Sequence, residues 1–516
     1  MHSKWLVLLS VAGVSIASCS DDDDGDGGSG ASNSGGTSGA ANSGGKTQAG
    51  GTGGRVGTGG AGNGGSSTGT GGVGNGGSSG GVAPIAGASA GGDDGVDGGG
   101  APNTDGGTPG ASGAPETGGS GGAAPTASTC VFPAAAALAD AALPEGFCAW
   151  NFAIGIGKAR GITIDAEGNA LVVSSAKNEV VALWDDDGDG VSGDGERAIV
   201  ASAPGLNHGI AIHDGYLYAS SVTTVYRWSY AADRQPLGAA TTVVNAIPSG
   251  GHSTRSLALD DDYLYVTVGS GGNLDANSER ARIRRFPIEE LDDNPAFAEG
   301  EVFADGLRNE VGIRFDSSGR LWGVENGRDN LERDDLGGDI HQDNPAEELN
   351  LFAEAGKFYG YPYCFSEYAL ADGVGMGPGT QWADPEFIDD GTHTDAWCQD
   401  ASNVVPPALS MQGHSAPLDL IFYPGGSFPG SFTGDLFVSF HGSWNRTQAT
   451  GYKVMHIPFG SDGMPSGDPV PLLESSGAAD DDWGHRPVGL GVLPNGILLV
   501  TSDESSRVLA VGYEAP

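Results

Sequence analysis

The sequence predicts an all-β fold, a six-bladed β-propeller, on three observations. One pattern occurs six times: a polar or basic residue, an alternating apolar run, a turn, and a second apolar run. Apolar residues at every second position, interrupted by Gly, Asp and Asn, indicate antiparallel hairpins. The pattern recurs about every 45–55 residues, apart from two longer gaps, as propeller blades do. Finally, the residue that opens a copy is in most cases basic or an amide.

The six copies should form the inner strands of six blades. They are Arg160–Val173, His208–Ala219, Arg255–Val266, Asn309–Val324, Ala416–Val438 and Arg486–Val500. Because the blades of a propeller surround a central channel, we expect the opening residues to converge there, namely Arg160, His208, Arg255, Asn309 and Arg486. Basic and amide groups gathered at one cavity indicate a site for an anionic ligand.

Residues 1–18 resemble a lipoprotein signal peptide. Lys4 precedes an apolar stretch that is too short to span a bilayer. This stretch ends in Ile-Ala-Ser followed by Cys19, which matches a lipobox, where the cysteine is acylated. An ordinary signal peptide whose cleavage leaves a cysteine is the alternative. Ser20 after the cysteine favours the outer membrane, so we expect an exported domain that is lipid-anchored to the cell envelope.

The composition separates a tether from a folded domain. Residues 19–128 consist mainly of Gly, Ser, Ala, Thr and Pro, with an acidic patch at Asp21–Asp24. Such a segment cannot bury a core, so it should be a disordered linker. Residues 129–516 are long enough for one six-bladed domain.

The formal net charge of −42 limits the possible partners. An acidic protein is repelled by phosphate backbones and by anionic lipid surfaces. We therefore expect no nucleic-acid partner, and membrane contact only through the lipid anchor.

Four cysteines remain besides Cys19, and an even number in an exported chain indicates two disulfides. We expect Cys130 to pair with Cys148, and Cys364 with Cys398. Three connectivities are possible, and the sequence alone does not choose among them. A zinc site is the alternative, but no CxxC spacing supports it.

One acidic segment fits a calcium-binding loop. Asp185, Asp187 and Asp189 occupy positions 1, 3 and 5, Gly190 occupies position 6, and Glu196 occupies position 12. Clustered carboxylate oxygens suit a hard cation, and the glycine permits the sharp turn. The flanking segments have strand patterns, so this is a calcium loop without an EF-hand. A solvated acidic turn is the alternative.

Several polar residues at the predicted blade entrances suit catalysis. His252 lies just before the third inner strand, where its imidazole could act as a general base. Arg308 beside Asn309 offers a guanidinium fork for a carboxylate and an amide for a carbonyl. Gly327, in the turn of the same blade, would let backbone carbonyls approach a metal closely.

These segments resemble the glucose/sorbosone dehydrogenase family, the soluble sugar dehydrogenases that depend on pyrroloquinoline quinone (PQQ). The strings that carry the resemblance are GGHSTR, VGSGGN, GLRNEVGIRF, ENGRD, EELN, FYGYPYC, HGSWNR and HRPVG, and they cover essentially all of Cys130–Pro516 in family order. The strings GLRN, FYGYP, HGSWNR and RPVG are most similar to the sorbosone and pyranose dehydrogenase side of the family.

The resemblance implies roles for individual residues. His252 would be the general base, and the backbone oxygens of Gly327 and Arg328 would bind a calcium ion that polarises the quinone. The implied cofactor contacts are Arg308, Asn309, Asn326 and Arg486, with His414, Trp444 and Arg446 on the same wall. PQQ carries three carboxylates, which matches the excess of arginine.

The chain departs from the family pattern in three places. Gly251 stands where the glucose-oxidising members have an acidic residue, and Arg328 stands where they have proline. The insert between Tyr359 and Gly413 is long and should form a lid or specificity loop.

The sequence thus predicts PQQ- and calcium-dependent oxidation of an aldose or related sugar. Electrons would pass to a separate periplasmic or membrane acceptor, because the chain has no CxxCH haem motif. Two alternatives remain. A calcium-dependent lactonase would need side-chain carboxylates around an axial metal, whereas the blade entrances appear mainly basic or amide in sequence. A non-catalytic surface propeller would have lost the cofactor site.

Overall fold

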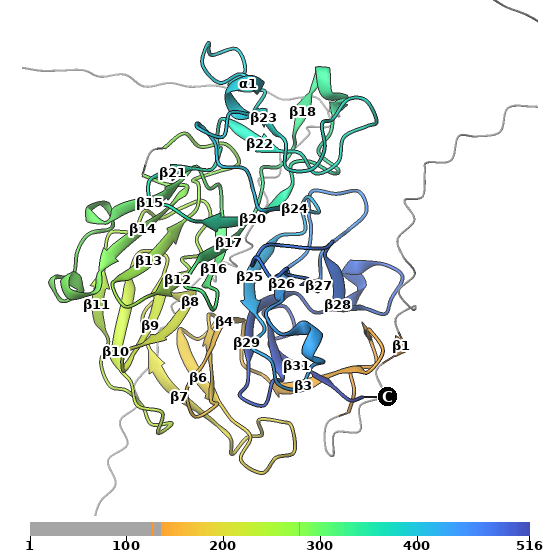
Figure 1. Cartoon of the computed structure of the whole chain (residues 1–516). Helices are drawn as coiled ribbons and strands as arrows, with labels where there is room; N and C mark the ends of the chain where they lie inside the picture. Colours follow the sequence, from red (N-terminus) through yellow and green to blue (C-terminus); the bar gives the residue numbers. More distant parts are fainter. Residues whose placement is uncertain (1–125, 128–135, 278, 516) are drawn as a thin grey trace, which may run out of the picture. The chain divides into compact units, whose positions relative to one another are not determined.

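The structure is a computed structural model, and it describes residues 126–127, 136–277 and 279–515. The predicted signal peptide, the lipidation site Cys19 and all of the predicted tether except residues 126–127 lie outside these residues. In the described part, six sheets form a ring of six blades, as predicted (Figure 1). No helix in that part is long and apolar enough to span a membrane.

The first three blades follow each other along the chain, each running from its inner to its outer strand. Blade 1 contains β4 (Ala159–Ile164), β5 (Ala170–Ser174), β6 (Glu179–Leu183) and β7 (Arg197–Ser202). Blade 2 contains β8 (Leu206–His213), β9 (Tyr216–Ser221), β10 (Val225–Ser229) and β11 (Thr241–Val244). Blade 3 contains β12 (Leu257–Leu259), β13 (Tyr263–Val268), β14 (Arg282–Pro287) and β15 (Glu301–Asp305), with β21 (Lys357–Phe358) parallel at its edge.

The other three blades complete the ring. Blade 4 contains β16 (Glu310–Phe315), β17 (Leu321–Glu325), β20 (Glu347–Phe352) and β24 (Leu409–Met411). Blade 5 contains β25 (Pro417–Phe422), β26 (Leu436–Phe440), β27 (Lys453–Ile457) and β28 (Val470–Ser475), extended by β2 (Ala141–Leu143) and β1 (Thr126–Ala127). Blade 6 contains β29 (Pro487–Val492), β30 (Leu498–Ser502), β31 (Arg507–Tyr513) and β3 (Phe147–Ile154).

The two ends of the domain close the ring together. The early strand β3 pairs antiparallel with the last strand β31, from Phe147 opposite Tyr513 to Ile154 opposite Arg507. Blade 6 is therefore built from both ends of the domain. Such closure leaves only short sheet edges exposed, which protects an all-β fold from edge-to-edge association.

Glycines let the inner strands approach one another at the axis. A Cβ atom added at Gly161 would lie 2.0 Å from the carbonyl oxygen of His208, and one at Gly209 would lie 2.2 Å from that of Arg255. Only a residue without a side chain fits these positions. The Gly-Ile pair that follows the opening residue in blades 1 and 2 therefore reflects backbone packing around the channel.

The inner strands are irregular where they begin. The register between the first and second strands shifts near the start of β4, β8, β16, β25 and β29. Bulges of this kind bend a strand and redirect its side chains, and they are common beside active sites. They occur at the channel end where the polar opening residues lie.

The apolar core lies between neighbouring blades. Between blades 1 and 2, for example, Leu171 and Val173 of β5 pack with Leu217 and Ala219 of β9, and all four are fully buried. Because each strand alternates its side chains between the two faces of its sheet, every blade contacts both of its neighbours.

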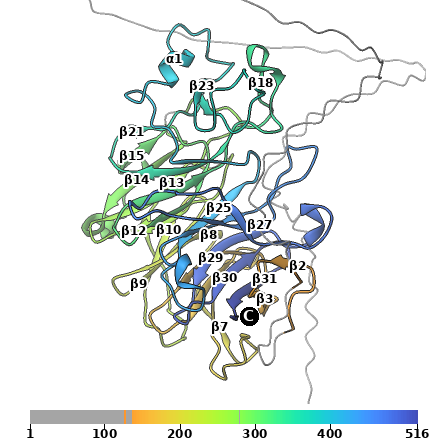
Figure 2. The ribbon, with the colours of Figure 1, turned by 45° about the vertical axis from the view of Figure 1, so that its right-hand side comes forward.

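The insert of blade 4 forms a small separate cap beyond β20 (Figures 1 and 2). It contains the hairpin of β22 (Cys364–Ser366) and β23 (Gln381–Ala383) and the short helix α1 (Asp395–Cys398). A second hairpin, β18 (Glu332–Arg333) with β19 (Gly338–Asp339), precedes β20. Other helical turns are η1 (Ile288–Asp293), η2 (Phe297–Glu299), η3 (Asp334–Leu336), η4 (Gly430–Phe432) and η5 (Asp480–Trp483).

The predicted disulfide of the insert is confirmed. Cys364 and Cys398 are bonded and join β22 to α1. Cys148 of β3 is also disulfide-bonded. Cys130 lies outside the described residues, so its pairing with Cys148 stays a prediction.

Replacing both Cys364 and Cys398 with serine should loosen the insert while the blades stay folded. The bond closes a loop of 34 residues, and loss of such a constraint costs about 2–4 kcal/mol of stability. Limited proteolysis should cut the variant within 364–398 before any blade strand. Equal protection of the insert in the variant and the native protein would contradict this.

Candidate active site

Two adjoining hollows lie at the channel end where the inner strands begin. The outer one, here called the mouth pocket, is lined by Arg308, Gly327, Asp329, Glu347, His414, Gly442, Ser443 and Trp444. The deeper one, the floor chamber, has a volume of about 40 Å³ and is lined by Arg160, Ser253, Thr254, Val311, Leu418 and His441. His252, Asn309, Asn326 and Ala416 line both hollows. The structure thus brings His252, Arg308, Asn309, Asn326, Gly327, His414 and Trp444 together, although they come from three blades, 3, 4 and 5.

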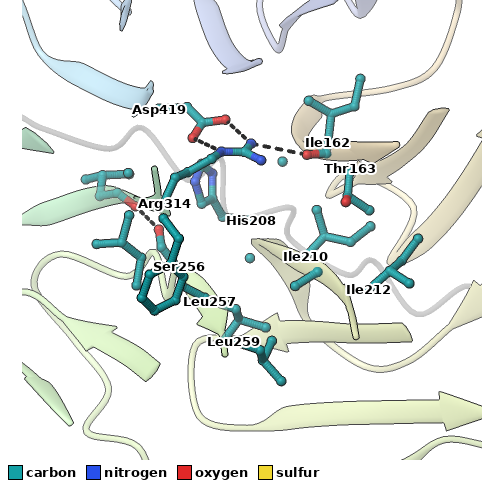
Figure 3. Close-up of a pocket in the computed structure, with 18 residues that line it drawn as sticks. Ile162, Thr163, His208, Ile210, Ile212, Ser256, Leu257, Leu259, Arg314 and Asp419 are labelled. Atoms are coloured by element: carbon teal, nitrogen blue, oxygen red, sulfur yellow. Dashed lines mark hydrogen bonds and ion pairs between the residues drawn. The ribbon is translucent and has the colours of Figure 1, made fainter. Parts of the chain in front are cut away.

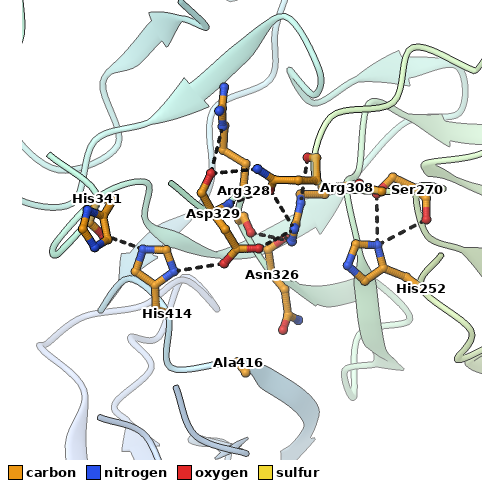
Figure 4. A network of polar contacts seen from close by, with 12 residues as sticks. His252, Ser270, Arg308, Asn326, Arg328, Asp329, His341, His414 and Ala416 are labelled. Atoms are coloured by element: carbon orange, nitrogen blue, oxygen red, sulfur yellow. Dashed lines mark hydrogen bonds and ion pairs between the residues drawn. The ribbon is translucent and has the colours of Figure 1, made fainter. Parts of the chain in front are cut away.

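Arg308 connects the loops that form the mouth pocket through several hydrogen bonds (Figure 4). Its Nη1 donates to the carbonyl oxygen of Gly327 at 2.6 Å, and its Nη2 binds Asp329 at 2.8 Å and Asn273 Oδ1 at 3.1 Å. Its Nε donates to the carbonyl oxygen of Asn273 at 3.2 Å, and its backbone N–H donates to the buried Glu325. The guanidinium fork therefore joins the loop after β13 to the turn after β17.

The contacts of His252 define its tautomer. Its Nδ1 lies 3.0 Å from Ser270 Oγ and 3.3 Å from the carbonyl oxygen of Ser270. The Ser270 hydroxyl itself donates to the carbonyl oxygen of Gly272 at 2.7 Å. Both oxygens of Ser270 therefore accept, so Nδ1 carries the proton and Nε2 keeps its lone pair. Nε2 makes no hydrogen bond to any described residue.

Burial keeps the His252 imidazole neutral. Desolvation, and next the positive charge of Arg308, lower its pKa from 6.5 to about 3, while Asp329 acts in the opposite direction. Burial disfavours the charged form of an imidazole, and a nearby cation adds to this effect. A neutral imidazole with a free Nε2 lone pair can accept a proton.

His414 has the opposite character. Its Nε2 donates to the carbonyl oxygen of His341 at 2.6 Å, and its Nδ1 lies 3.6 Å from Asp329. Burial lowers the pKa of His414, but the contacts with Asp329 and Glu347 outweigh it and raise the pKa overall. Both ring nitrogens of His414 thus face acceptors on the pocket wall, which favours its protonated form. His414 and Ala416 have positive φ of 63° and 54°, a strained conformation that is frequent at functional sites.

A buried carboxyl supports the turn that carries Gly327. Glu347 accepts the backbone N–H groups of Gly327 at 2.8 Å and of Ala416 at 3.1 Å. Burial raises its pKa to about 7, although the positive charge of His414 lowers it in part. Glu347 therefore links blades 4 and 5 beneath the pocket.

An ion-paired group borders the floor chamber. His441 Nε2 lies 3.0 Å from Asp503 Oδ1, and Arg160 Nη1 lies 2.8 Å from Asp503 Oδ2. Arg486 donates to the carbonyl oxygens of His441 at 3.1 Å and of Gly442 at 3.2 Å. Among the described residues, Arg486 has no carboxylate within 4 Å, so its charge is uncompensated there.

The other predicted wall residues lie at the rim. Trp444 lines the mouth pocket with 47% of its surface exposed. Arg446 donates hydrogen bonds to the carbonyl oxygen of Gln342 and to the carboxylate of Asp343. Arg328 forms an ion pair with Asp384 at 2.6 Å. Arg446 is not among the residues that line either hollow.

The expectation that Arg255 faces the channel is wrong. Its guanidinium is fully buried and donates to the carbonyl oxygens of Val222, Pro248, His252 and Thr254. A buried guanidinium needs acceptors for its N–H groups, and the loop before β12 supplies them. Arg255 thus supports the loop that carries His252.

His208 lies deeper than expected. It lines a separate lower chamber of about 270 Å³ further along the inner strands, together with apolar residues and the Arg314–Asp419 ion pair (Figure 3). Val311 lines both the floor chamber and the lower chamber, and it packs with Leu418 and Val488 in a small buried cluster. This apolar layer separates the catalytic end of the channel from the lower chamber.

The acidic loop between β6 and β7 gathers three of its four predicted ligands. Carboxylate oxygens of Asp185, Asp187 and Asp189 all lie within 4.8 Å of one another. Glu196 instead accepts backbone N–H groups of Asp186 at 2.7 Å and Gly193 at 3.0 Å.

The expectation of mainly basic and amide blade entrances is wrong in part. Asp329 and Glu347 line the mouth pocket, and Asp503 borders the floor chamber. They do not form a metal site of the lactonase type: within residues 136–277 and 279–515, the only suitably spaced group of three or more ligands is the Asp185 loop. Ser270, Asp329 and Glu347 occur in the strings VGSGGN, ENGRD and EELN, so the signal for them was present.

Comparison with known proteins defines the family. The TrAA12-like family model matches residues 141–514, so the chain belongs to this family. A PQQ-dependent pyranose dehydrogenase of Coprinopsis cinerea is 33% identical over 397 residues, covering 69% of this chain and 52% of that protein. A PQQ-dependent sugar dehydrogenase of Hypocrea jecorina (strain QM6a) is 31% identical over 405 residues, covering 71% and 88%. The chain thus spans about half the length of the Coprinopsis relative.

Solved structures agree with this assignment. The holo PQQ domain of the Coprinopsis cinerea pyranose dehydrogenase matches with a TM-score of 0.63 at 30% identity, covering 72% of this chain and 97% of that one. A calcium structure of a Trichoderma reesei carbohydrate-active enzyme of family AA12 matches with a TM-score of 0.64 at 29% identity, covering 75% and 99%. The predicted resemblance to PQQ-dependent sugar dehydrogenases, which are oxidoreductases, is confirmed.

Acidification should destabilise the protein partly through His252. The pKa of His252 is about 3 in the folded protein, against 6.5 for an unperturbed histidine such as that of the unfolded chain. Between about pH 3 and pH 6.5, the unfolded chain therefore binds a proton at this residue that the folded protein does not bind. Stability is therefore lost as the pH falls through this window. In urea unfolding between about pH 7 and about pH 4.5, His252→Gln should lose less stability than the native protein. An equal or larger loss in the variant would show that His252 is not held neutral.

Proposed function

We propose that this protein is a PQQ-dependent dehydrogenase that oxidises an aldose or related pyranose sugar at the anomeric carbon. The observation that carries the proposal is the tautomer of His252, whose free Nε2 lone pair lies at a cavity walled by amide and cationic groups. The names of the relatives from Coprinopsis cinerea and Hypocrea jecorina support the cofactor and the sugar class.

The wall residues suit the chemistry of PQQ, a flat quinone with three carboxylates. Arg486 lines neither hollow, but it lies beside Gly442 of the mouth pocket and has an uncompensated charge among the described residues. The contacts of His414 raise its pKa and favour the protonated ring. Asn309 and Asn326 bring amides to both hollows, and the exposed ring of Trp444 offers a flat apolar surface. These residues would hold the cofactor.

We further propose that calcium binds at the turn after β17. Gly327 packs so tightly that a Cβ atom would meet Pro345 at 2.7 Å. The Gly327 carbonyl oxygen accepts from Arg308 Nη1; calcium held by the carbonyls of Gly327 and Arg328 would share or replace that contact. A second calcium ion would bind the carboxylates of Asp185, Asp187 and Asp189, and Glu196 would join them on releasing its backbone N–H contacts.

The residues of the site would have the following roles in the reaction. When bound, PQQ supplies a quinone that accepts hydride and calcium supplies a Lewis acid. His252 Nε2 takes the proton of the anomeric hydroxyl, and Ser270 keeps the ring in the required tautomer. Arg308 and Asp329 hold the turn of Gly327 in place.

The cellular setting belongs to the same proposal. A signal peptide at residues 1–18 and lipidation of Cys19 would anchor the exported domain to the cell envelope, with 19–128 as its tether. Electrons would then leave to a separate periplasmic or membrane acceptor.

A reconstitution assay tests this function. Protein supplied with PQQ and calcium should reduce a redox dye with at least one member of a panel of aldoses and osones. His252→Ala should lower kcat/KM by about 10²–10⁴-fold while PQQ binding is retained, because it removes only the base. His213→Ala, at the far end of β8, serves as the control.

Two results would contradict the proposal. Failure of the native protein to bind PQQ would leave a non-catalytic surface propeller as the better account. Unchanged sugar-dependent dye reduction in His252→Ala would assign the base to another residue.

A further inference from the structure

The floor chamber contains a second imidazole with a free lone pair. His441 Nε2 faces the carboxylate of Asp503 at 3.0 Å. A carboxylate only accepts, so Nε2 carries the proton and Nδ1 keeps the lone pair. Nδ1 makes no hydrogen bond within the described part of the chain. His441 and His252 line the same chamber.

The chamber suits bridging water. Its volume of about 40 Å³ exceeds the roughly 10–15 Å³ that one water requires. Amides and hydroxyls of Asn309, Asn326 and Thr254 line it beside the two imidazoles. Val311 and Leu418 close it on the side of the lower chamber. Water held there would connect His252 to His441.

From these contacts we infer that His441 is a proton-relay residue, and that Asp503 is its positioning residue. The inference rests on the proposed function. In this oxidation the anomeric carbon loses a hydride, which carries two electrons and one proton. The proton of the anomeric hydroxyl group moves separately, to His252. A cofactor and a sugar in the mouth pocket would cover His252, so its proton needs another exit. Water in the floor chamber passes that proton to His441 Nδ1, which returns His252 to its neutral form.

The groups around His441 determine whether it can accept the proton. The pKa of His441 is lowered overall: desolvation, and further Arg486 and Arg160, lower it, while Asp503 acts in the opposite direction. His208 also faces it from blade 2 and is itself neutral, because burial and Arg160 lower its pKa. Asp503 thus stabilises the imidazolium.

The relay also needs a place where the proton leaves His441. The side chains of His441 and Asp503 keep 14% and 13% of their surface exposed. Arg160 compensates the charge of Asp503 at 2.8 Å, and its presence keeps the carboxylate ionised. In the proposed relay, the proton on His441 leaves from this exposed surface of the pair.

The test compares His441→Gln and Asp503→Asn with a matched control. His456 forms the same kind of pair with Asp435, at 2.7 Å and with similar burial, but it lies on β27, the third strand of blade 5, and lines neither hollow. His456→Gln therefore reports the structural cost of losing a buried histidine–aspartate pair. Gln at 441 can still donate an N–H to Asp503 but cannot accept and release a proton.

Four readouts separate the relay from the proposed function. PQQ affinity by calorimetry, and the first anaerobic turnover with sugar, should stay within about twofold of the native protein in His441→Gln. Steady-state dye reduction in weak buffer should fall about tenfold, and added imidazole should restore it. In the apo protein, histidine NMR should show the Nε2–H tautomer of His441, with its pKa lower in Asp503→Asn than in the native protein.

The relay is overturned if His441→Gln turns over like the native protein in weak buffer, if His456→Gln loses as much, or if imidazole does not rescue. It is also overturned if His441 carries its proton on Nδ1. A native protein that does not bind PQQ would overturn the proposed function as well, and the calorimetry alone would show this.

Discussion

The guanidinium fork of Arg308 is the interaction on which the site depends. It spans from Asn273, after the second strand of blade 3, to Gly327 and Asp329, after the second strand of blade 4. These loops have no regular hydrogen-bonding pattern of their own, so a rigid planar donor with several N–H groups holds them in place. The same charge lowers the pKa of His252, so the interaction that positions the wall also keeps the base neutral.

The three histidines around the cavity show how partners decide protonation. His252 donates to Ser270 and stays neutral, whereas the carbonyl and the carboxylate that His414 contacts raise its pKa. His441 pairs with Asp503, which Arg160 already compensates, and it remains neutral with a free Nδ1. In the proposed function, rings of one residue type would therefore serve as base, cofactor contact and proton relay around one cavity.

Much of this arrangement could be predicted from sequence, because period-2 patterns and their recurrence depend on local composition. The placement of His252, Arg308 and Asn309 at blade entrances followed from the same repeat. The directions in which the side chains of the opening residues point could not be predicted from the repeat. Arg160 and Arg255 occupy equivalent positions, yet the carbonyl oxygens around Arg255 draw it away from the channel. The partners of a buried group lie far apart in sequence, so hydrogen bonding could not be inferred.

The most direct test of this account is a calorimetric titration of PQQ, with calcium present, into the native protein and Arg308→Lys. Lysine keeps the positive charge but cannot bridge Asn273, Gly327 and Asp329 at once, so PQQ affinity should fall by at least about tenfold. Arg285→Lys, on the surface ion pair with Glu301, should bind as the native protein does. Equal affinities in the native protein and Arg308→Lys, or no binding to either, would contradict the account.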